Sequence, residues 1–256
     1  MGEVAAIVLA AGKSTRMRSE LPKVLHEVCG RPMLSYVLNA CRLSGVDRIL
    51  VVVGHEKEKV VDRFAADRDL VFIEQTEQRG TGHAVMCCRE ALAGMDGSVL
   101  VVAGDMPLVR RETLADLVDV RVERGDALTF ATTELDDPTG YGRIVRDARG
   151  ELVSIVEHRD CTDEQLGIQE VNVSYYCFES RKLMDGLSRL TPNPTKGEYY
   201  LTDLVRIFRN DGDKVSAVVR VAAADALGIL AGLDVLSARR HLLCVARAEI
   251  SWADRR

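Results

Sequence analysis

Four continuous apolar runs constrain the fold of this chain more than any other feature of its sequence. The runs cover residues 4–9, 49–53, 70–73 and 99–103. Stretches with helical periodicity, such as residues 33–44 and 82–93, lie between them. A strand without polar alternation is buried on both faces, so this β-α-β-α order predicts an α/β fold with a parallel sheet flanked by helices. Ligands of such sheets bind beyond the carboxyl ends of the strands.

The pattern changes after about Asp126. Strands without long helices between them are predicted at residues 128–133, 144–146, 152–156 and 171–178, and they indicate a mixed, β-rich extension of the sheet. A loop, a helix, a strand and a terminal amphipathic helix are expected at residues 191–197, 200–209, 215–221 and 235–250. We expect one large domain over residues 1–234, followed by a C-terminal helix and tail over residues 235–256.

The composition argues against several classes of protein. A formal net charge of −5 over 256 residues, without a basic stripe, disfavours nucleic-acid partners and predicts that positive charge is concentrated at any phosphate site. The seven cysteines have no metal-binding spacing and are typical of reduced thiols in a core. No run approaches about 18 apolar residues and no leader precedes the first strand, so we expect a cytoplasmic protein without a membrane partner.

A loop of small residues follows the first apolar run. Leu9, Ala10, Ala11 and Gly12 let the backbone approach a ligand closely, and their amide groups can converge on phosphate oxygens. The spacing fits neither the dinucleotide-binding fingerprint nor the P-loop. Such turns also occur in α/β proteins that bind no phosphate. Three cations close to this loop favour the phosphate site: Lys13, Arg16 and Lys23.

A second loop delivers a carboxylate to the end of a buried strand. Gly104 permits close approach of the backbone, and Asp105 supplies the hard oxygen ligand that Mg²⁺ prefers when it also coordinates phosphates. The alternative is that Asp105 only caps the following helix. Together with the first loop, Asp105 predicts a magnesium site.

A third loop is polar and punctuated by glycine. It carries Gln75 and Gln78, followed by Gly80 and Thr81 at the start of a helix. An amide side chain offers both a donor and an acceptor and can therefore read the edge of a pyrimidine. A capped turn without a ligand explains the same residues. His83 is expected to be a packing residue near the helix N-terminus.

The order of several motifs supports a family resemblance. The L-A-A-G-x-x-x-R-M loop followed by Pro22-Lys23 resembles nucleotidyltransferases. The motifs P-T-G-Y-G-R-I, V-E-H, Q-E-x-N and G-E-Y-Y-L-T-D, within residues 137–203, resemble the uridyltransferase domain of the bacterial bifunctional N-acetylglucosamine-1-phosphate uridyltransferase/glucosamine-1-phosphate acetyltransferase. The resemblance covers roughly residues 4–221. It implies a Rossmann-like nucleotidyltransferase fold with a β-rich sugar-binding lobe.

The resemblance also implies roles for individual residues. The residues from Leu9 to Gly12, with Gln75, Gly80 and Thr81, would hold a uridine nucleotide. Lys23 would contact the triphosphate and Arg16 the departing pyrophosphate. The hydroxyl and acetamido groups of the sugar would be bound by Gly140, Glu157 and Asn172.

Three features depart from the family pattern. The second magnesium ligand of the family is an asparagine, and Gly228 stands at that position; Asp225 or water would have to replace it. Val173-Ser174 stands where the family more often has Thr-Gly. The chain ends before the hexapeptide repeats of the acetyltransferase domain would begin, so acetyl transfer is not expected and the oligomeric state is open.

These residues predict Mg²⁺-dependent transfer of UMP from UTP to N-acetylglucosamine 1-phosphate, giving UDP-N-acetylglucosamine and pyrophosphate. The reaction requires no protein nucleophile, because the attacking phosphate is already ionised. Two alternatives stay open. One is a pyrophosphorylase for another sugar 1-phosphate, and the other is a nucleotide-sugar-binding protein that has lost catalysis, which Gly228 favours.

Overall fold

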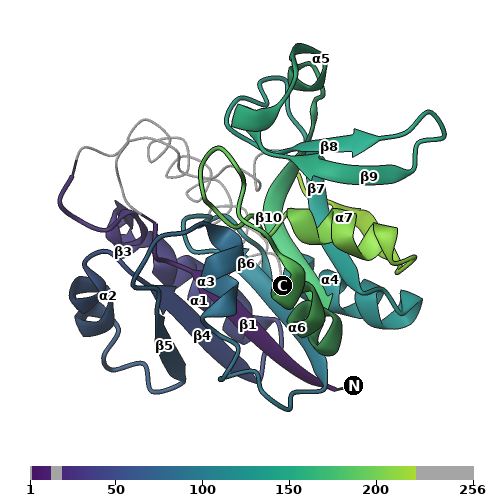
Figure 1. Cartoon of the computed structure of the whole chain (residues 1–256). Helices are drawn as coiled ribbons and strands as arrows, with labels where there is room; N and C mark the ends of the chain where they lie inside the picture. Colours follow the sequence, from purple (N-terminus) through teal and green to yellow (C-terminus); the bar gives the residue numbers. More distant parts are fainter. Residues whose placement is uncertain (1, 13–18, 223–256) are drawn as a thin grey trace, which may run out of the picture.

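The computed structural model describes residues 2–12 and 19–222 of the chain (Figure 1). In this part of the chain one nine-stranded sheet has the main strand order β11-β7-β10-β6-β1-β4-β5, and β8 and β9 extend it from β10. Of the seven main strands only β10 is antiparallel to its neighbours. The main strands are β1 (Glu3–Leu9), β4 (Arg48–Val53), β5 (Leu70–Glu74), β6 (Gly97–Ala103), β7 (Leu128–Glu134), β10 (Glu170–Glu179) and β11 (Val215–Arg220).

Helices cover both faces of this sheet, as the apolar runs predict. Ala6 and Val8 of β1 pack in one core cluster, whereas Ala5 and Ile7 pack in the other. The first cluster includes residues of α1 (Met33–Leu43), α2 (Lys57–Arg63) and α4 (Arg111–Arg124). The second includes residues of α3 (Thr81–Met86), α6 (Ser180–Arg189) and α7 (Asp203–Asn210). None of the helices in the described ranges is long and apolar enough to cross a bilayer.

Of the four strands predicted after Asp126, two are β7 and β10 of the main sheet, and the other two form a lobe above it (Figure 1). Its core is the antiparallel hairpin of β8 (Arg143–Arg146) and β9 (Leu152–Val156), which joins β10 through pairing of Arg143 with Val171. Five short elements complete the secondary structure of the described residues. They are η1 (Lys23–Leu25), the β2 (Glu27–Val28) and β3 (Arg31–Pro32) pair, and η2 (His158–Asp160) with α5 (Asp163–Leu166).

The helix predicted over residues 82–93 is shorter in the structure. α3 ends at Met86, and turns continue the chain to Gly94. The backbone bonds beyond Met86 include tighter i→i−3 contacts, such as Cys88 N to Val85 O at 3.0 Å. Helices α2, α4 and α6 were not individually predicted. The terminal helix expected over residues 235–250, and the domain boundary at residue 234, lie outside the described residues.

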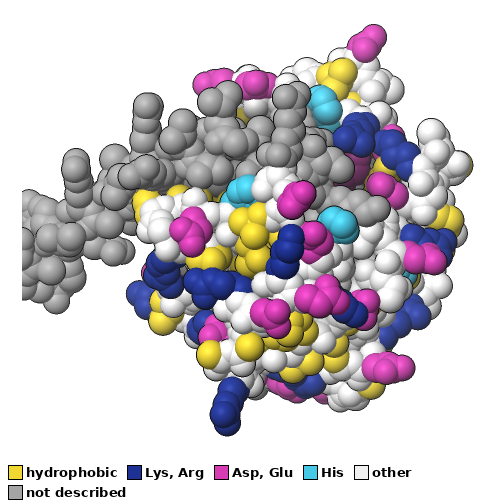
Figure 2. Space-filling view, turned by 90° about the vertical axis from the view of Figure 1, so that its left-hand side faces the viewer, with side chains coloured by type: hydrophobic (Ala, Val, Ile, Leu, Met, Phe, Trp, Pro, Cys, Tyr) yellow, Lys and Arg dark blue, Asp and Glu magenta, His cyan; other side chains and the backbone are white. Residues whose placement is uncertain are grey.

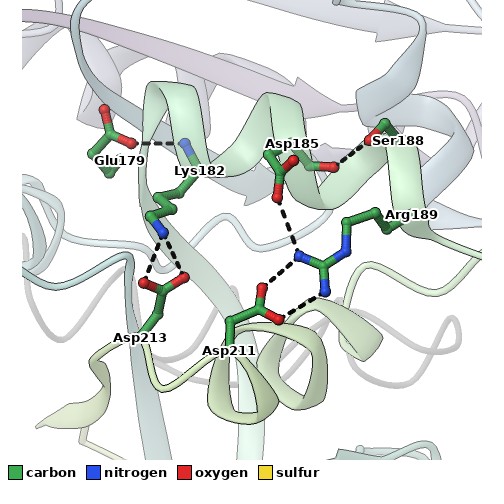
Figure 3. Close-up of polar contacts among 7 residues, drawn as sticks. All are labelled: Glu179, Lys182, Asp185, Ser188, Arg189, Asp211 and Asp213. Carbon is green, nitrogen blue, oxygen red and sulfur yellow. Dashed lines mark hydrogen bonds and ion pairs between the residues drawn. The ribbon is translucent and has the colours of Figure 1, made fainter.

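Ion pairs connect α6 with the turn between α7 and β11 (Figure 3). Lys182 Nζ lies 2.7 Å from Asp213 Oδ1, and Arg189 contacts both Asp185 and Asp211. Each pair is largely exposed and therefore contributes little by itself. Because β11 starts beside the first residue of β7, this network lies at the amino ends of the parallel strands, away from the edge where ligands are expected.

Candidate functional site

The carboxyl ends of four neighbouring strands bring the predicted loops together. Ala10 N donates to Val52 O at 2.8 Å, Gln75 N donates to Val53 O at 2.7 Å, and Gly104 N donates to Leu9 O at 2.9 Å. These bonds place the loops that follow β1, β5 and β6 at one edge of the sheet. Residues far apart in the sequence thus share one surface.

Small residues are required where these loops meet. A Cβ added at Gly104 would lie 2.9 Å from Leu9 O, and one at Gly54 would lie 3.0 Å from the Cβ of Ala11. The Cβ added at Gly54 would also lie 2.8 Å from Gln78 Nε2, so Gln78 lies next to the loop after β1. A Cβ at Gly12 meets nothing within 4 Å, so this residue faces open space. Close backbone approach by a ligand is therefore sterically possible along this loop.

Lys23 and Asp105 form an ion pair at this edge. Lys23 begins η1, Asp105 follows β6, and Lys23 Nζ contacts Asp105 Oδ2. The side chains are only 20% and 27% exposed, respectively. Helix capping does not explain Asp105, because α4 begins after Arg110 and has no side-chain cap. A carboxylate and an ammonium group therefore lie side by side next to the glycine loop.

The donor set at this position fits magnesium. Mg²⁺ is usually held by one or two carboxylates, substrate phosphates and several waters, so Asp105 alone supplies a sufficient protein anchor. Among the described residues there is no group of three or more His, Cys, Asp or Glu side chains that could hold a metal ion. Asp225 and Gly228, the positions considered for a second ligand, lie outside the described residues, as do Lys13 and Arg16.

The Gln75 loop closes against a distant segment of the chain. Gly80 has φ +94°, and a Cβ there would lie 2.5 Å from Tyr199 O, so only glycine fits. Tyr199 N donates to Arg79 O at 2.7 Å, and Gly82 N donates to Tyr199 O at 2.8 Å. Thr81 Oγ1 accepts from Leu201 N at 3.1 Å. The segment of residues 198–202 is thus hydrogen-bonded along the whole Gly80 turn.

The predicted sugar-side residues gather where β8, β9 and β10 meet. Asn172 N donates to Gly142 O at 2.9 Å. A Cβ at Gly142 would lie 3.6 Å from Val156 O and 3.8 Å from the Cβ of Asn172, so the end of β9 and Asn172 flank this glycine. Glu157 directly follows β9 and accepts a hydrogen bond from Thr202 Oγ1 at 3.1 Å. Gly140 is exposed in the turn before β8.

The 198–202 segment connects the two groups of residues. Its Tyr199 and Leu201 contact the Gly80 turn, whereas its Thr202 contacts Glu157. On the other side, β10 pairs with β6 so that Tyr175 is opposite Val102, which brings the Asn172 end of β10 beside the loop of Asp105. The structure therefore links the Gln75 loop to Glu157 through the 198–202 segment and sets the Asn172 end of β10 beside the Asp105 loop.

Two side chains of this region, Glu157 and Tyr176, have raised pKa values. Burial raises the pKa of Glu157, and the carboxylates of Asp160 and Asp203 raise it further, while Thr202 and Lys196 oppose the shift. Burial also raises the pKa of Tyr176, whose hydroxyl accepts from Asn172 Nδ2 at 2.5 Å. Glu157 has no cation bonded to it among the described residues, so its acceptor oxygens are suited to neutral hydroxyl donors.

Sequence reasoning missed Thr202 and Tyr176. Thr202 lies within the G-E-Y-Y-L-T-D motif, but nothing in its spacing points to Glu157, 45 residues earlier. Tyr176 reads as one of several apolar residues in a buried strand, and only a bulge of β10 between Asn172 and Tyr176 brings their side chains together. The one sequence signal for this contact is the polar residue Asn172 within a mostly apolar strand.

Ser174 sits in the bulge with φ +60°, a conformation that glycine adopts at lower cost. We expect Ser174→Gly to raise the free energy of unfolding by about 1 kcal/mol. Ser174→Ala is the matched control, because it removes the hydroxyl and keeps the strained Cβ. Urea unfolding of the three proteins measures the difference. A glycine variant no more stable than the alanine variant would contradict the assignment of strain.

The surface agrees with the acidic composition. On the face drawn in Figure 2, lysine and arginine side chains are interspersed with aspartate and glutamate side chains and do not gather in one field.

A glycine loop, a lysine and a carboxylate lie at the carboxyl edge of this mostly parallel α/β sheet, and a family match shows that the chain is a nucleotidyltransferase. Residues 6–193 match the model of the MobA-like NTP transferase domain, and the chain belongs to this nucleotidyltransferase family. It is 43% identical over 229 residues to the bifunctional protein GlmU of Geobacter metallireducens, a match that covers 90% of this chain and 48% of that protein. For GlmU of Streptococcus thermophilus the identity is 44% over 224 residues, with 88% and 48% covered.

These relatives confirm the resemblance to one part of a bacterial bifunctional protein. The chain spans about half the length of the relatives it matches. Solved structures share the fold at lower identity. A protein described as a glucose-1-phosphate thymidylyltransferase from Bacillus anthracis has a TM-score of 0.75 at 16% identity, covering 93% of this chain and 94% of its own. A UDP-glucose pyrophosphorylase complexed with UDP-glucose has a TM-score of 0.69 at 18% identity, covering 85% and 90%. They confirm the predicted α/β nucleotidyltransferase fold.

Proposed function

We propose that the protein transfers UMP from UTP to N-acetylglucosamine 1-phosphate, giving UDP-N-acetylglucosamine and pyrophosphate, with Mg²⁺ as its metal. The observation that carries this proposal is the hydrogen-bonded 198–202 segment, which joins the Gly80 turn to the Glu157 group. A nucleotide on one side and a sugar phosphate on the other would therefore be held in contact. A cytoplasmic location is part of the same proposal.

In the proposed reaction an oxygen of the sugar phosphate attacks the α-phosphorus of UTP. The bond from the α-phosphorus to the bridging oxygen breaks, and pyrophosphate leaves with the electron pair. The attacking phosphate is ionised near neutral pH, so the chain need not supply a base. Catalysis then depends on alignment of the two phosphates and on positive charge around them.

Each residue has a definite task in this scheme. Lys23 would bind the triphosphate, Asp105 would hold Mg²⁺, and Arg16 with Lys13 would contact the pyrophosphate. The bound metal would offset negative charge on the phosphates. The ion pair of Lys23 and Asp105 keeps both groups at the phosphate edge before any substrate binds. A second ligand from Asp225, or water in its place, belongs to this proposal.

The sugar side explains why an N-acetylated sugar is favoured. Asn172 and Glu157 together offer amide and carboxylate groups, which match an acetamido group and hydroxyl groups. Thr202 orients the Glu157 carboxylate through its hydroxyl, and the hydroxyl of Tyr176 accepts a hydrogen bond from the Asn172 amide. We assign the sugar contacts to Gly140, Glu157 and Asn172.

Pyrophosphate release from purified protein tests the proposal. We expect release with Mg²⁺, UTP and N-acetylglucosamine 1-phosphate, and at least tenfold less with glucose 1-phosphate or galactosamine 1-phosphate. Preference for either of those sugars would replace the proposed substrate while keeping the reaction. Binding of UTP without release from any pair would instead indicate a binding protein, the alternative suggested by Gly228.

A further inference from the structure

The side chain of Gln75 is held by two acceptors. Gln75 is only 3% exposed, and its Nε2 lies 3.1 Å from Gly80 O and 3.0 Å from His83 Nδ1. A carbonyl oxygen can only accept, so the amide nitrogen of Gln75 must face it. The lone pair of an amide nitrogen is delocalised into its carbonyl group and does not accept a hydrogen bond, so His83 Nδ1 accepts the second hydrogen of Nε2. His83 therefore carries its own ring proton on Nε2.

The remaining amide atom of Gln75 is left for a ligand. Both donor hydrogens of Nε2 are used within the protein, and the described residues donate no hydrogen bond to Oε1. Gly80 O also accepts from Ala84 N at 3.1 Å, so it is fixed by the first turn of α3. Rotation of the amide by 180° would set Oε1 against the carbonyl oxygen of Gly80, which can only accept, and would turn Nε2 away from both of its present partners. Gln75 thus presents an acceptor and cannot present a donor.

We propose that His83 is a positioning residue for base selection, which acts with Gly80 O to lock the Gln75 amide with Oε1 toward the nucleotide base. The inference rests on the proposed function, because it takes the Gln75 loop as the base site. Uracil has a hydrogen on N3, whereas cytosine has a lone pair there. An Oε1 atom fixed in this direction accepts a hydrogen bond from N3–H of uracil and repels the N3 lone pair of cytosine. A glutamine free to rotate would pair with both.

The position of His83 suits this task. It is the third residue of α3, and its ring lies 6.3 Å from the ring of Tyr199, so packing holds the imidazole in place. Tyr199 is itself bonded through its backbone to Arg79 and Gly82. The same contacts that close the Gly80 turn therefore also fix the orientation of the amide.

Nucleotide selectivity tests the inference. His83→Phe keeps a ring beside Tyr199 and removes the acceptor, whereas His83→Asn keeps an acceptor oxygen near the position of Nδ1. The KM and kcat would be measured with UTP, 5-methyl-UTP and CTP, at saturating N-acetylglucosamine 1-phosphate and Mg²⁺. We expect the UTP-to-CTP ratio of kcat/KM to fall about tenfold in His83→Phe, mainly through KM, and His83→Asn to restore most of it. 5-Methyl-UTP, which shares the N3 hydrogen, should follow UTP.

An equal loss with UTP and CTP in His83→Phe, or a ratio unchanged within twofold, would overturn the inference. Nitrogen NMR of the wild-type imidazole gives a reading that needs no variant to fold: we expect the Nε2–H tautomer, and the Nδ1–H tautomer would contradict the assignment. Failure of the wild-type protein to turn over UTP would count against the proposed function instead. The dissociation constants of UTP and CTP for the same variants would then decide the role of His83.

Discussion

Asp105→Asn is expected to lower the rate of pyrophosphate release by about a thousandfold at saturating substrates, with the fold retained. The asparagine has the shape of Asp105 but lacks the charge that we propose holds Mg²⁺. The side chain is partly exposed and bonded to Lys23, so its loss costs little stability. The measurement is kcat against Mg²⁺ concentration, with thermal unfolding as the test of folding. Removal of Mg²⁺ by a chelator should abolish the wild-type activity, and added Mg²⁺ should restore it.

Asp96→Asn is the matched control for this variant. Asp96 precedes β6 and Asp105 follows it, so the two carboxylates stand at opposite ends of one strand. Asp96 is paired with Arg181 in an exposed ion pair, and we expect its replacement to leave kcat unchanged. If Asp105→Asn retained more than about a tenth of the wild-type rate, the metal assignment of Asp105 would be wrong.

Glu157→Gln is expected to raise the KM for N-acetylglucosamine 1-phosphate about fiftyfold and at the same time to stabilise the protein. The glutamine still accepts from Thr202 but is a weaker acceptor for sugar hydroxyls. Burial raises the pKa of Glu157, which means that ionising it opposes folding. Removal of the charge should therefore increase the free energy of unfolding at neutral pH.

The stabilisation should depend on pH with a definite sign. Near pH 4 the carboxyl is largely protonated in both the folded and unfolded states, so wild-type and variant proteins should differ little. As the pH rises through the unfolded and then the raised folded pKa, the wild-type protein loses stability that the variant keeps. Urea unfolding from pH 4 to pH 8 measures this difference. Glu151→Gln, at the exposed residue just before β9, should change neither KM nor stability. If the stability advantage of Glu157→Gln over the wild-type protein became smaller as the pH rises, the proposed effect of burial on Glu157 would be contradicted.

Much of the sheet was predictable because its strands are buried on both sides. Alternate residues of β1 enter different core clusters, so the strand reads as continuously apolar. Helix α4 was not predictable from apolar residues in this way, because only Leu114, Leu117 and Val118 of this helix are buried and many of its other residues are charged. The end of α3 was also missed, because residues 87–94 keep a helical hydrophobic spacing while forming turns.

The candidate site was predictable where a motif follows a strand directly. Gly104 and Asp105 are such a case, since chain order alone puts them at the carboxyl edge. The contact of Asp105 with Lys23 was not predictable from spacing, because 82 residues separate them. His83 was expected only to pack against its surroundings. Its bond to Gln75 depends on the angle at which α3 leaves the Gly80 turn, which local sequence does not specify.

The backbone contacts of Tyr199 bear on how substrate preferences can change in proteins with this fold. The main-chain N and O of Tyr199 bond Arg79 O and Gly82 N, while its ring and hydroxyl contact the Arg79 guanidinium and its ring lies beside His83. The residues that we propose to bind the sugar, such as Glu157 and Asn172, lie outside the 198–202 segment. Under the proposed function, exchange of those side chains would alter the sugar preference and leave the contacts of Tyr199, and with them the choice of base, in place.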